Sequence, residues 1–257
     1  EGDIWIIYNG EIYNFKDIKI DLEKKGHKFK SNSDTEVIIH AYEEYGPGCV
    51  NLFNGMFAFA IYDSKNKRLV LARDRLGVKP LYYYFDEKNN KFIFSSEIKS
   101  IILNPYVKRE LNYSALSQLI YYAYTINRET LIKNINELLP GHLMIYDFNQ
   151  IKIIKYWDLK NKINNNSLEF NADKLRFMLN ESVRKRLVAD VPLGASLSGG
   201  IDSASIVHFM SQLNTNPVKT FTVGFNDNSD ELNEAREIAE FYKTDHHEII
   251  VNFKALF

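Results

Sequence analysis

Cysteine, long hydrophobic runs and net charge are all scarce in this sequence, and each shortage excludes a class of protein. A single cysteine, Cys49, rules out an internal disulfide framework and any cysteine-based metal cluster, which fits a reducing cytoplasm. No apolar run approaches the roughly 18 residues that span a bilayer, and there is no signal-like start. Lys and Arg number 32 against 33 Asp and Glu, so no overall field favours nucleic acid. We expect a globular cytoplasmic protein with neither nucleic acid nor a membrane as its partner.

The chain is long enough for two ordinary domains, with 257 residues and 45% hydrophobic content. Its first part is dominated by β patterns. We predict one strand and then three hairpins, at 3–8, 56–72, 81–94 and 142–156, the last with a turn at 147–150.

Two helices are predicted before the hairpins, at 15–25 and 35–45. Each is followed by a glycine, Gly26 or Gly46, which is a common helix stop. Ser33 and Glu36 have the spacing of a capping box at the start of the second helix.

Beyond a polar segment, helices and strands alternate. Four apolar residues recur every four positions and predict an amphipathic helix: Leu175, Leu179, Val183 and Leu187. Strands are predicted at 193–197, 218–224 and 248–251, with helices at 203–213 and 231–242. This alternation is typical of βαβ units with a parallel sheet. The predicted fold class is therefore α+β followed by α/β.

The loop Ser198-Gly-Gly-Ile-Asp-Ser203 joins a predicted strand to a predicted helix. In a βαβ unit such a loop directs backbone N–H groups and the positive end of the helix dipole outward, which suits an anion. Gly199 and Gly200 allow close approach, and the hydroxyls of Ser198 and Ser203 add donors. The loop lacks the lysine of a Walker A motif, and Asp202 suits phosphates accompanied by Mg²⁺. The alternative is a plain strand-to-helix turn.

With its flanking segments 191–197, 220–225 and 244–248, this loop resembles the ATP pyrophosphatase domain of glutamine-dependent asparagine synthetases. The resemblance implies that the loop binds the β- and γ-phosphates of ATP and that Asp202 helps to position Mg²⁺. It also implies that Leu197 and the backbone of Val223 line the adenine pocket. The ATP residues implied by the resemblance are Leu197, Ser198, Gly199, Gly200, Ile201, Asp202, Ser203 and Val223.

Several motifs in the first part resemble the class II glutamine amidotransferase domain of the same family, namely 8–14, 33–36, 55–60, 72–82, 95–99 and 139–142. Their ordered occurrence is more specific than any one of them. The resemblance implies an amino-terminal-nucleophile-type αββα fold with antiparallel sheets.

The same resemblance implies roles for four residues in glutamine binding. The side chain of Asn9 and the backbone N–H of Gly10 would stabilise the tetrahedral oxyanion, while Glu11 and Asp34 would hold the ammonium group of glutamine. Two alternatives stay open. Asn9-Gly10 alone is typical of a type I′ hairpin turn, and Asp34 could act only through helix-end electrostatics.

Some family features have no counterpart. The family's amino-terminal nucleophilic cysteine is missing, and we expect Cys49 to be a small buried residue. A glutamine-clamping arginine before Asn9 and an acidic, glycine-rich segment after Phe257 are also missing. We therefore expect an internal fragment that catalyses neither half-reaction alone. His246 and His247 cannot easily share a metal, because neighbours on a strand face opposite sides. They are predicted to be structural or to support a neighbouring site residue. The tyrosines at 82–84 and 121–122 are predicted to be core and hairpin aromatics.

The predicted domains are a glutamine amidotransferase domain at 1–159, a linker at 160–170 and an asparagine synthetase ATP-binding domain at 171–257. The expected function is glutamine-dependent asparagine synthesis with ATP and Mg²⁺, in which ammonia from glutamine amidates the activated β-carboxylate of aspartate. Related amide-forming ligases, of the β-lactam synthetase or peptide cyclase type, and a non-catalytic paralogue are the alternatives. The resemblance allows a homodimer and leaves the acceptor carboxylate and the ammonia route open.

Overall fold

The computed structural model of the protein describes residues 2–148, 150–225 and 231–251. The chain divides into two units, Glu1–Asn161 and Lys162–Phe257. Some predicted positions lie outside the described residues: Asn149 in the turn at 147–150, and residues 1, 226–230 and 252–257 of the two predicted domains.

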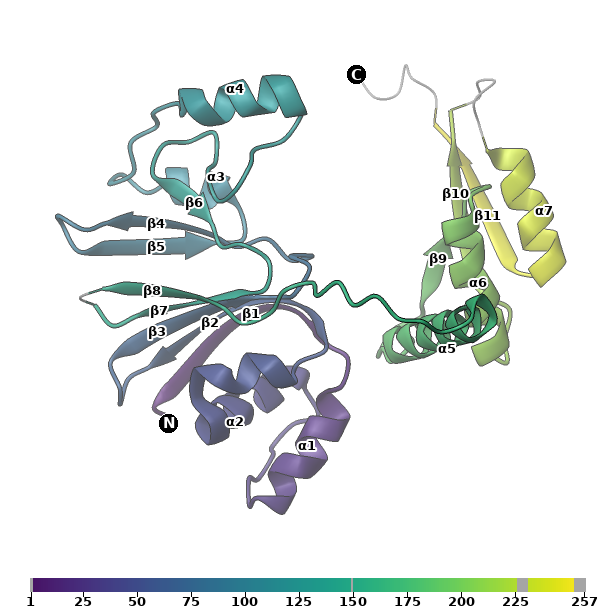
Figure 1. Ribbon diagram of the computed structural model, residues 1–257, viewed down its shortest axis with the longest axis horizontal. Coiled ribbons are helices and arrows are strands. Elements are labelled where there is room, and N and C mark those ends of the chain that lie inside the picture. Colours follow the sequence, from purple (N-terminus) through teal and green to yellow (C-terminus); the bar gives the residue numbers. More distant parts are fainter. Residues whose placement is uncertain (1, 149, 226–230, 252–257) are drawn as a thin grey trace. The chain divides into compact units, whose positions relative to one another are not determined.

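The first unit contains two antiparallel sheets (Figure 1). The larger has the strand order β1-β2-β3-β7-β8, formed by β1 (Ile4–Ile12), β2 (Gly55–Asp63), β3 (Arg68–Arg73), β7 (His142–Tyr146) and β8 (Ile151–Lys155). The smaller has the order β5-β4-β6, formed by β4 (Tyr82–Asp86), β5 (Lys91–Ser95) and β6 (Ile135–Glu137). All three predicted hairpins are confirmed.

Alternation along β2 explains how the two sheets and the helices stack. Phe57, Phe59 and Ile61 point to one face of the larger sheet, where they share a core with α1 (Phe15–Lys24) and α2 (Asp34–Tyr45). Ala58 and Ala60 point to the other face, where their small side chains let the second sheet pack closely.

Helices also cover the outer face of the smaller sheet. Ile101 of α3 (Ile98–Ile102) packs there with Tyr84 and Ile135. The layers therefore run helices, sheet, sheet, helices, which confirms the predicted αββα arrangement. Figure 1 also shows α4 (Tyr113–Tyr122) on this side of the unit.

The second unit has a parallel sheet, as predicted. Its order is β11-β10-β9, with β9 (Gly194–Ser196), β10 (Lys219–Gly224) and β11 (Asp245–Ile250). The helices are α5 (Leu168–Arg186), α6 (Ile201–Leu213) and α7 (Leu232–Tyr242), and their buried residues share a core with β9. Helix α5 begins inside the segment 160–170, because the hydroxyl of Ser167 caps it by accepting from the N–H of Phe170 at 3.2 Å.

The aromatic prediction is half right. Tyr83 and Tyr84 are buried in β4, whereas Tyr121 and Tyr122 lie on α4 with 81% and 49% of their surface exposed. The placement of Tyr121 and Tyr122 as core or hairpin residues is therefore wrong.

Cys49 is a buried residue of the 3₁₀ helix η1 (Gly46–Leu52), as predicted. Burial raises the pKa of its thiol to about 12, because the thiolate would lose its hydration. The group is therefore protonated at neutral pH and unsuited to nucleophilic attack.

In the described part of the chain, no helix combines the length and the apolar character that crossing a membrane requires.

Candidate functional site

Asn9, Gly10 and Glu11 are consecutive residues of β1, paired with Ala58, Phe57 and Met56 of β2. The strand runs on to Ile12 without a turn, so the type I′ hairpin alternative for Asn9-Gly10 is wrong. Successive side chains alternate between the faces of a strand. Tyr8 and Ile12 pack against the helices, and Asn9 and Glu11 therefore share the opposite face.

Gly10 is required because β2 approaches its backbone closely. Its φ is +151°, a conformation that other residues rarely adopt, and a Cβ built there would lie 2.1 Å from the carbonyl oxygen of Met56. A side chain at this position would push the two strands apart.

The backbone N–H of Gly10 points out of the edge of the sheet. Opposite residues of an antiparallel pair either exchange hydrogen bonds or both turn their backbone groups away from each other. Phe57 turns away: its N–H donates to Oδ2 of Asp74 at 3.1 Å, and its carbonyl accepts from the N–H of Asp74 at 2.8 Å. Gly10 therefore turns away as well, and β1 is the edge strand of the described sheet.

Asp74 is a buried residue of the motif 72–82 for which the sequence predicted no role of its own. Its carboxylate accepts from four backbone N–H groups, those of Phe57, Leu76, Val78 and Lys79, at 3.0 to 3.1 Å. It thereby fixes the strand segment opposite Gly10. The only signal in the sequence was an acidic residue between two arginines directly after a strand.

Asp34 ties α2 to β1. Its Oδ2 accepts from the hydroxyl of Tyr8 at 2.7 Å and from the backbone N–H of Ile12 at 2.9 Å. Burial, together with the hydrogen bond to the Asp34 carboxylate, raises the pKa of Tyr8 well above its usual range, so this hydroxyl remains a donor. Asp34 is also the first residue of α2, so the helix-end alternative is compatible with this contact.

The predicted capping box forms only in part. Ser33 caps α2 by accepting from the N–H of Thr35 at 3.1 Å. Glu36 reaches past Ser33 and accepts from the N–H groups of Lys30 and Ser31, both at 2.7 Å. The loop before α2 is therefore held by Glu36 rather than by the reciprocal bond to Ser33.

The amide of Asn9 lies near the loop that follows β5, where Nδ2 donates to Oγ of Ser96 at 3.4 Å. The four residues predicted for glutamine thus all lie on or next to one segment of β1. Asn9 and Glu11 are on the face away from the helices, Gly10 is at the edge, and Asp34 contacts Tyr8 and Ile12 from α2.

In the second unit, the loop Ser198–Gly200 lies between β9 and α6, as predicted. The hydroxyl of Ser203, in the first turn of α6, accepts from the N–H of Ser198 at 3.0 Å, and the two hydroxyl oxygens are 2.9 Å apart. The N–H of Gly200 donates to Oγ of Ser198 at 3.3 Å. These bonds shape a curved loop in which the N–H groups of Ser198 and Gly200 donate to hydroxyl oxygens of the same segment.

A carboxylate already occupies one position of this loop. The N–H of Gly199 donates to Oε2 of Glu231, the residue that precedes α7, at 3.2 Å. A Cβ at Gly199 would lie 2.5 Å from Cβ of Glu234, so only glycine allows α7 this close. The contact shows that the loop accepts an anionic oxygen.

The other predicted ATP residues surround the loop. Leu197 is buried and linked to β10 by the hydrogen bond from its N–H to the carbonyl of Phe221, while Val223 is exposed on β10. Ile201 and Asp202 are exposed in the first turn of α6. An exposed carboxylate at this position would fit Mg²⁺ if phosphates bound to the loop, because Mg²⁺ is commonly bound by one or two carboxylates and phosphate oxygens.

The adjacent histidines face opposite sides of β11, as predicted. Nδ1 of His246 lies 2.9 Å from Oγ1 of Thr220, and the ring of His247 stacks on Phe221 with centroids 5.3 Å apart.

Comparison with known proteins shows which family the chain belongs to. Residues 1–157 match the glutamine amidotransferase domain, and the chain belongs to that family. Residues 174–257 match the family described as asparagine synthase.

Among individual relatives, asparagine synthetase (glutamine-hydrolyzing) 3 of Bacillus subtilis (strain 168) is 33% identical over 100% of this chain and 44% of its own length. Asparagine synthetase (glutamine-hydrolyzing) 2 of the same organism is 39% identical over 87% of this chain and 31% of its own length. The chain spans less than half the length of these two relatives. Among solved structures, glutamine phosphoribosylpyrophosphate amidotransferase from B. subtilis, complexed with ADP and GMP, aligns with a TM-score of 0.44 and 14% identity, over 96% of this chain and 70% of that chain.

Replacing Gly10 by alanine should separate β1 from β2. We expect Gly10→Ala to lower the free energy of unfolding of this unit by about 2–5 kcal/mol, because overpacking and backbone strain add. Gly48→Ala is the matched control, since no atom lies within 4 Å of its Cβ position. Urea unfolding followed by circular dichroism measures both, and equal stability of the two variants would contradict the close approach of β2.

The loop Ser198–Gly200 leads to a second prediction, in which two variants change the affinity for magnesium ATP in opposite directions. Ser198→Ala should weaken binding of magnesium ATP about tenfold, the effect of losing one hydrogen bond to a charged group. Glu231→Gln keeps an acceptor for Gly199 but removes the competing charge, so binding should tighten about fivefold, or roughly 1 kcal/mol.

Isothermal titration calorimetry measures these affinities, with Glu237→Gln, an exposed acid of α7, as the control. If Glu231→Gln binds no more tightly than Glu237→Gln and Ser198→Ala has no effect, the phosphates bind elsewhere.

Proposed function

We propose that this chain is part of a glutamine-dependent asparagine synthetase, with a glutamine site on β1 and an ATP site at the loop Ser198–Gly200. The observation that carries the proposal is that one chain matches both families, the first over residues 1–157 and the second over residues 174–257. The names of the relatives support the same activity.

At the first site, hydrolysis of glutamine passes through a tetrahedral intermediate whose negative oxygen needs fixed donors. Nδ2 of Asn9 and the outward N–H of Gly10 would supply them. Glu11 and Asp34 would bind the ammonium group of glutamine by charge-assisted hydrogen bonds. The covalent step is not assigned to Cys49, because this thiol is buried and has a raised pKa.

At the second site, the loop and the first turn of α6 would hold the β- and γ-phosphates of ATP, with Leu197 and Val223 beside the adenine. Asp202 would bind Mg²⁺, which neutralises phosphate charge. A carboxylate oxygen of aspartate would attack the α-phosphorus, and the bond to pyrophosphate would break. Ammonia would then attack the acyl carbon and release AMP, giving asparagine. The protein contributes mainly the positions of these groups.

The finer predictions belong to the same proposal. We infer from the sequence and the family that aspartate is the acceptor and that the protein is cytoplasmic. On the same grounds we infer a homodimer and no nucleic-acid partner.

Two variants of Asp34 separate its structural contact from its role in binding. Tyr8 and Ile12 both donate to the same oxygen, Oδ2, so the amide oxygen of Asn can accept both bonds. Asp34→Asn should therefore have a free energy of unfolding within about 1 kcal/mol of the parent. It should bind glutamine about 10- to 100-fold more weakly, because it lacks the negative charge that would pair with the ammonium group of glutamine. Asp34→Ala should lose both properties.

Glutamine binding measured by calorimetry and thermal unfolding of the same samples test this. Asp17→Asn removes an exposed acid from the first turn of α1 and serves as the control. If Asp34→Asn binds glutamine as tightly as Asp17→Asn, Asp34 has a structural role alone and the glutamine site is elsewhere.

A further inference from the structure

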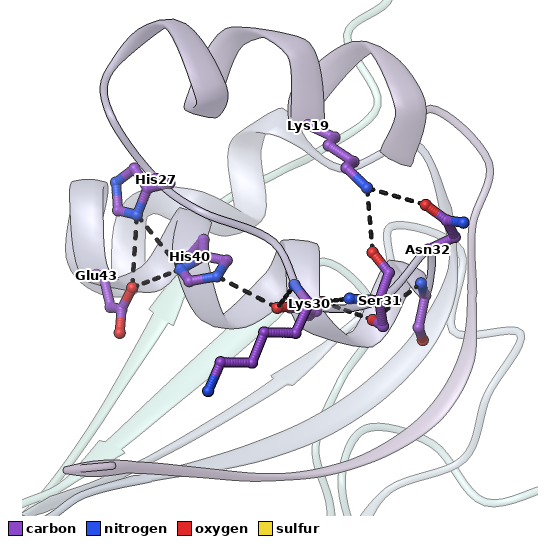
Figure 2. Close-up of polar contacts among 9 residues, drawn as sticks. Lys19, His27, Lys30, Ser31, Asn32, His40 and Glu43 are labelled. Atoms are coloured by element: carbon purple, nitrogen blue, oxygen red, sulfur yellow. Dashed lines mark hydrogen bonds and ion pairs between the residues drawn. The ribbon is translucent and has the colours of Figure 1, made fainter. Parts of the chain in front are cut away.

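Two histidines and a glutamate converge between α1 and α2, away from both sites described above. Figure 2 shows His27, His40 and Glu43 pointing toward one another. His40 and Glu43 lie three residues apart on α2, and His27 follows the end of α1. We call these three residues the two-histidine cluster.

The spacing of their ligand atoms matches a zinc site. Two ligands bound to zinc at 2.0–2.1 Å in a tetrahedron lie about 3.3–3.4 Å apart. Nδ1 of His27 is 3.3 Å from Nδ1 of His40 and 3.5 Å from Oε2 of Glu43. The third distance, from Nδ1 of His40 to Oε2 of Glu43, is 2.7 Å and would open slightly around an ion.

Each imidazole also has a carboxylate at its other nitrogen. Nε2 of His27 lies 3.2 Å from Oε2 of Glu44, and Nε2 of His40 lies 3.6 Å from Oε1 of Glu36. Histidines that bind metals usually donate this second N–H to a carboxylate or carbonyl, which orients the ring and makes the ligand nitrogen more basic. Glu44 favours the tautomer of His27 that leaves Nδ1 as an acceptor. In the absence of an ion, Nδ1 of His40 donates to Oε2 of Glu43, and a bound metal would replace this proton.

Glu36 is well suited to this orienting role. Its carboxylate accepts hydrogen bonds from the hydroxyl of Ser31 and from the backbone N–H groups of Lys30 and Ser31. These bonds hold the carboxylate in a fixed position beside His40. Figure 2 shows Lys30 and Ser31, whose backbone N–H groups donate to Glu36, in the loop before α2.

The backbone also fixes the position of His27. Gly26 has a φ of +97°, and the N–H of His27 donates to the carbonyl of Leu22 at 3.1 Å, which is the Schellman pattern at the end of α1. On the other side, the ring of Phe29 packs edge-on against His40 with centroids 4.6 Å apart. Neither imidazole depends on a flexible chain for its place.

The cluster is shallow enough for an ion to enter. The side chains of both histidines are 17% exposed, and that of Glu43 is 40% exposed. Nζ of Lys25 lies 2.7 Å from Oε1 of Glu44, the oxygen that does not face His27. The positive charge of Lys25 is therefore directed at Glu44 and not at the three ligand atoms. A tetrahedral ion would have its fourth position open to water.

We propose that His27, His40 and Glu43 bind one Zn²⁺ ion through Nδ1, Nδ1 and Oε2, with water as the fourth ligand. Two imidazoles and one carboxylate form a donor set that zinc accepts. The bound ion links the end of α1 to α2, the helix that also carries Asp34. The site is independent of the proposed ligase function.

Zinc binding to the metal-free full chain tests the proposal, by competition with a chromophoric chelator. We expect one Zn²⁺ per chain, and a rise in thermal midpoint with zinc that follows the affinity. His27→Gln and His40→Gln should each weaken binding at least about 100-fold, and Glu44→Gln, which removes only an orienting charge, about tenfold. His247→Gln removes an exposed imidazole elsewhere and should bind zinc like the parent.

Co²⁺ provides a second readout, because tetrahedral Co²⁺ absorbs visible light far more strongly than hydrated Co²⁺. We expect strong absorption for the parent and for His247→Gln, and its loss in Glu43→Gln. Glu43 is exposed, so this variant decides the question if a histidine variant fails to fold. The proposal is overturned if the parent binds no zinc, or if the variants of His27, His40 and Glu43 all bind it like the parent, which would leave the cluster as a set of hydrogen bonds alone.

Discussion

Oδ2 of Asp34 accepts two hydrogen bonds from β1, one on each side of the segment Asn9–Glu11. The donors are the hydroxyl of Tyr8, whose side chain faces the helices, and the backbone N–H of Ile12 at the end of the strand. A single oxygen thus fixes the distance between α2 and the strand that carries Asn9 and Gly10. On the neighbouring strand β2, Phe57 is held by Asp74, whose carboxylate accepts from the N–H of Phe57 and from three N–H groups of the loop after β3.

Together, the contacts of Asp34 and Asp74 hold the edge of β1 in a fixed conformation. Gly10 lies too close to Met56 to carry a side chain, and its N–H is turned outward because Phe57 is engaged by Asp74. Donors held in this way need little reorganisation when charge develops on a substrate oxygen, which is the condition for strong electrostatic stabilisation. In the second unit, the fixed donors belong to a different element, a loop with two glycines at the start of α6. The N–H of Gly199 in this loop donates to the carboxylate of Glu231.

Much of this could be predicted from local patterns. The pattern at 56–72 predicted the hairpin of β2 and β3. The loop predicted at 198–203 lies between a strand and a helix, although its last three residues form the first turn of α6. Helix α3, helix α4 and β6 were not predicted. They have five, ten and three residues, and α4 buries only Ala115, so it lacks a clear apolar stripe.

Contacts between distant residues could not be predicted from the sequence. The bond from Tyr8 to Asp34 spans 26 residues, and the role of Asp74 depends on strand pairing that its neighbours do not reveal. The two-histidine cluster is similar, because His27 and His40 meet only after α1 ends in a Schellman turn. The capping box forms only in part for a local reason, because Glu36 accepts from the backbone N–H groups of Lys30 and Ser31 instead of that of Ser33.

A crystal structure of the chain with bound L-glutamine would test the central claim most directly. We predict that the ammonium group lies within hydrogen-bond distance of Asp34 and that the side-chain carbonyl oxygen faces the N–H of Gly10 and Nδ2 of Asn9. Glutamine bound elsewhere, with the edge of β1 uncontacted, would contradict it.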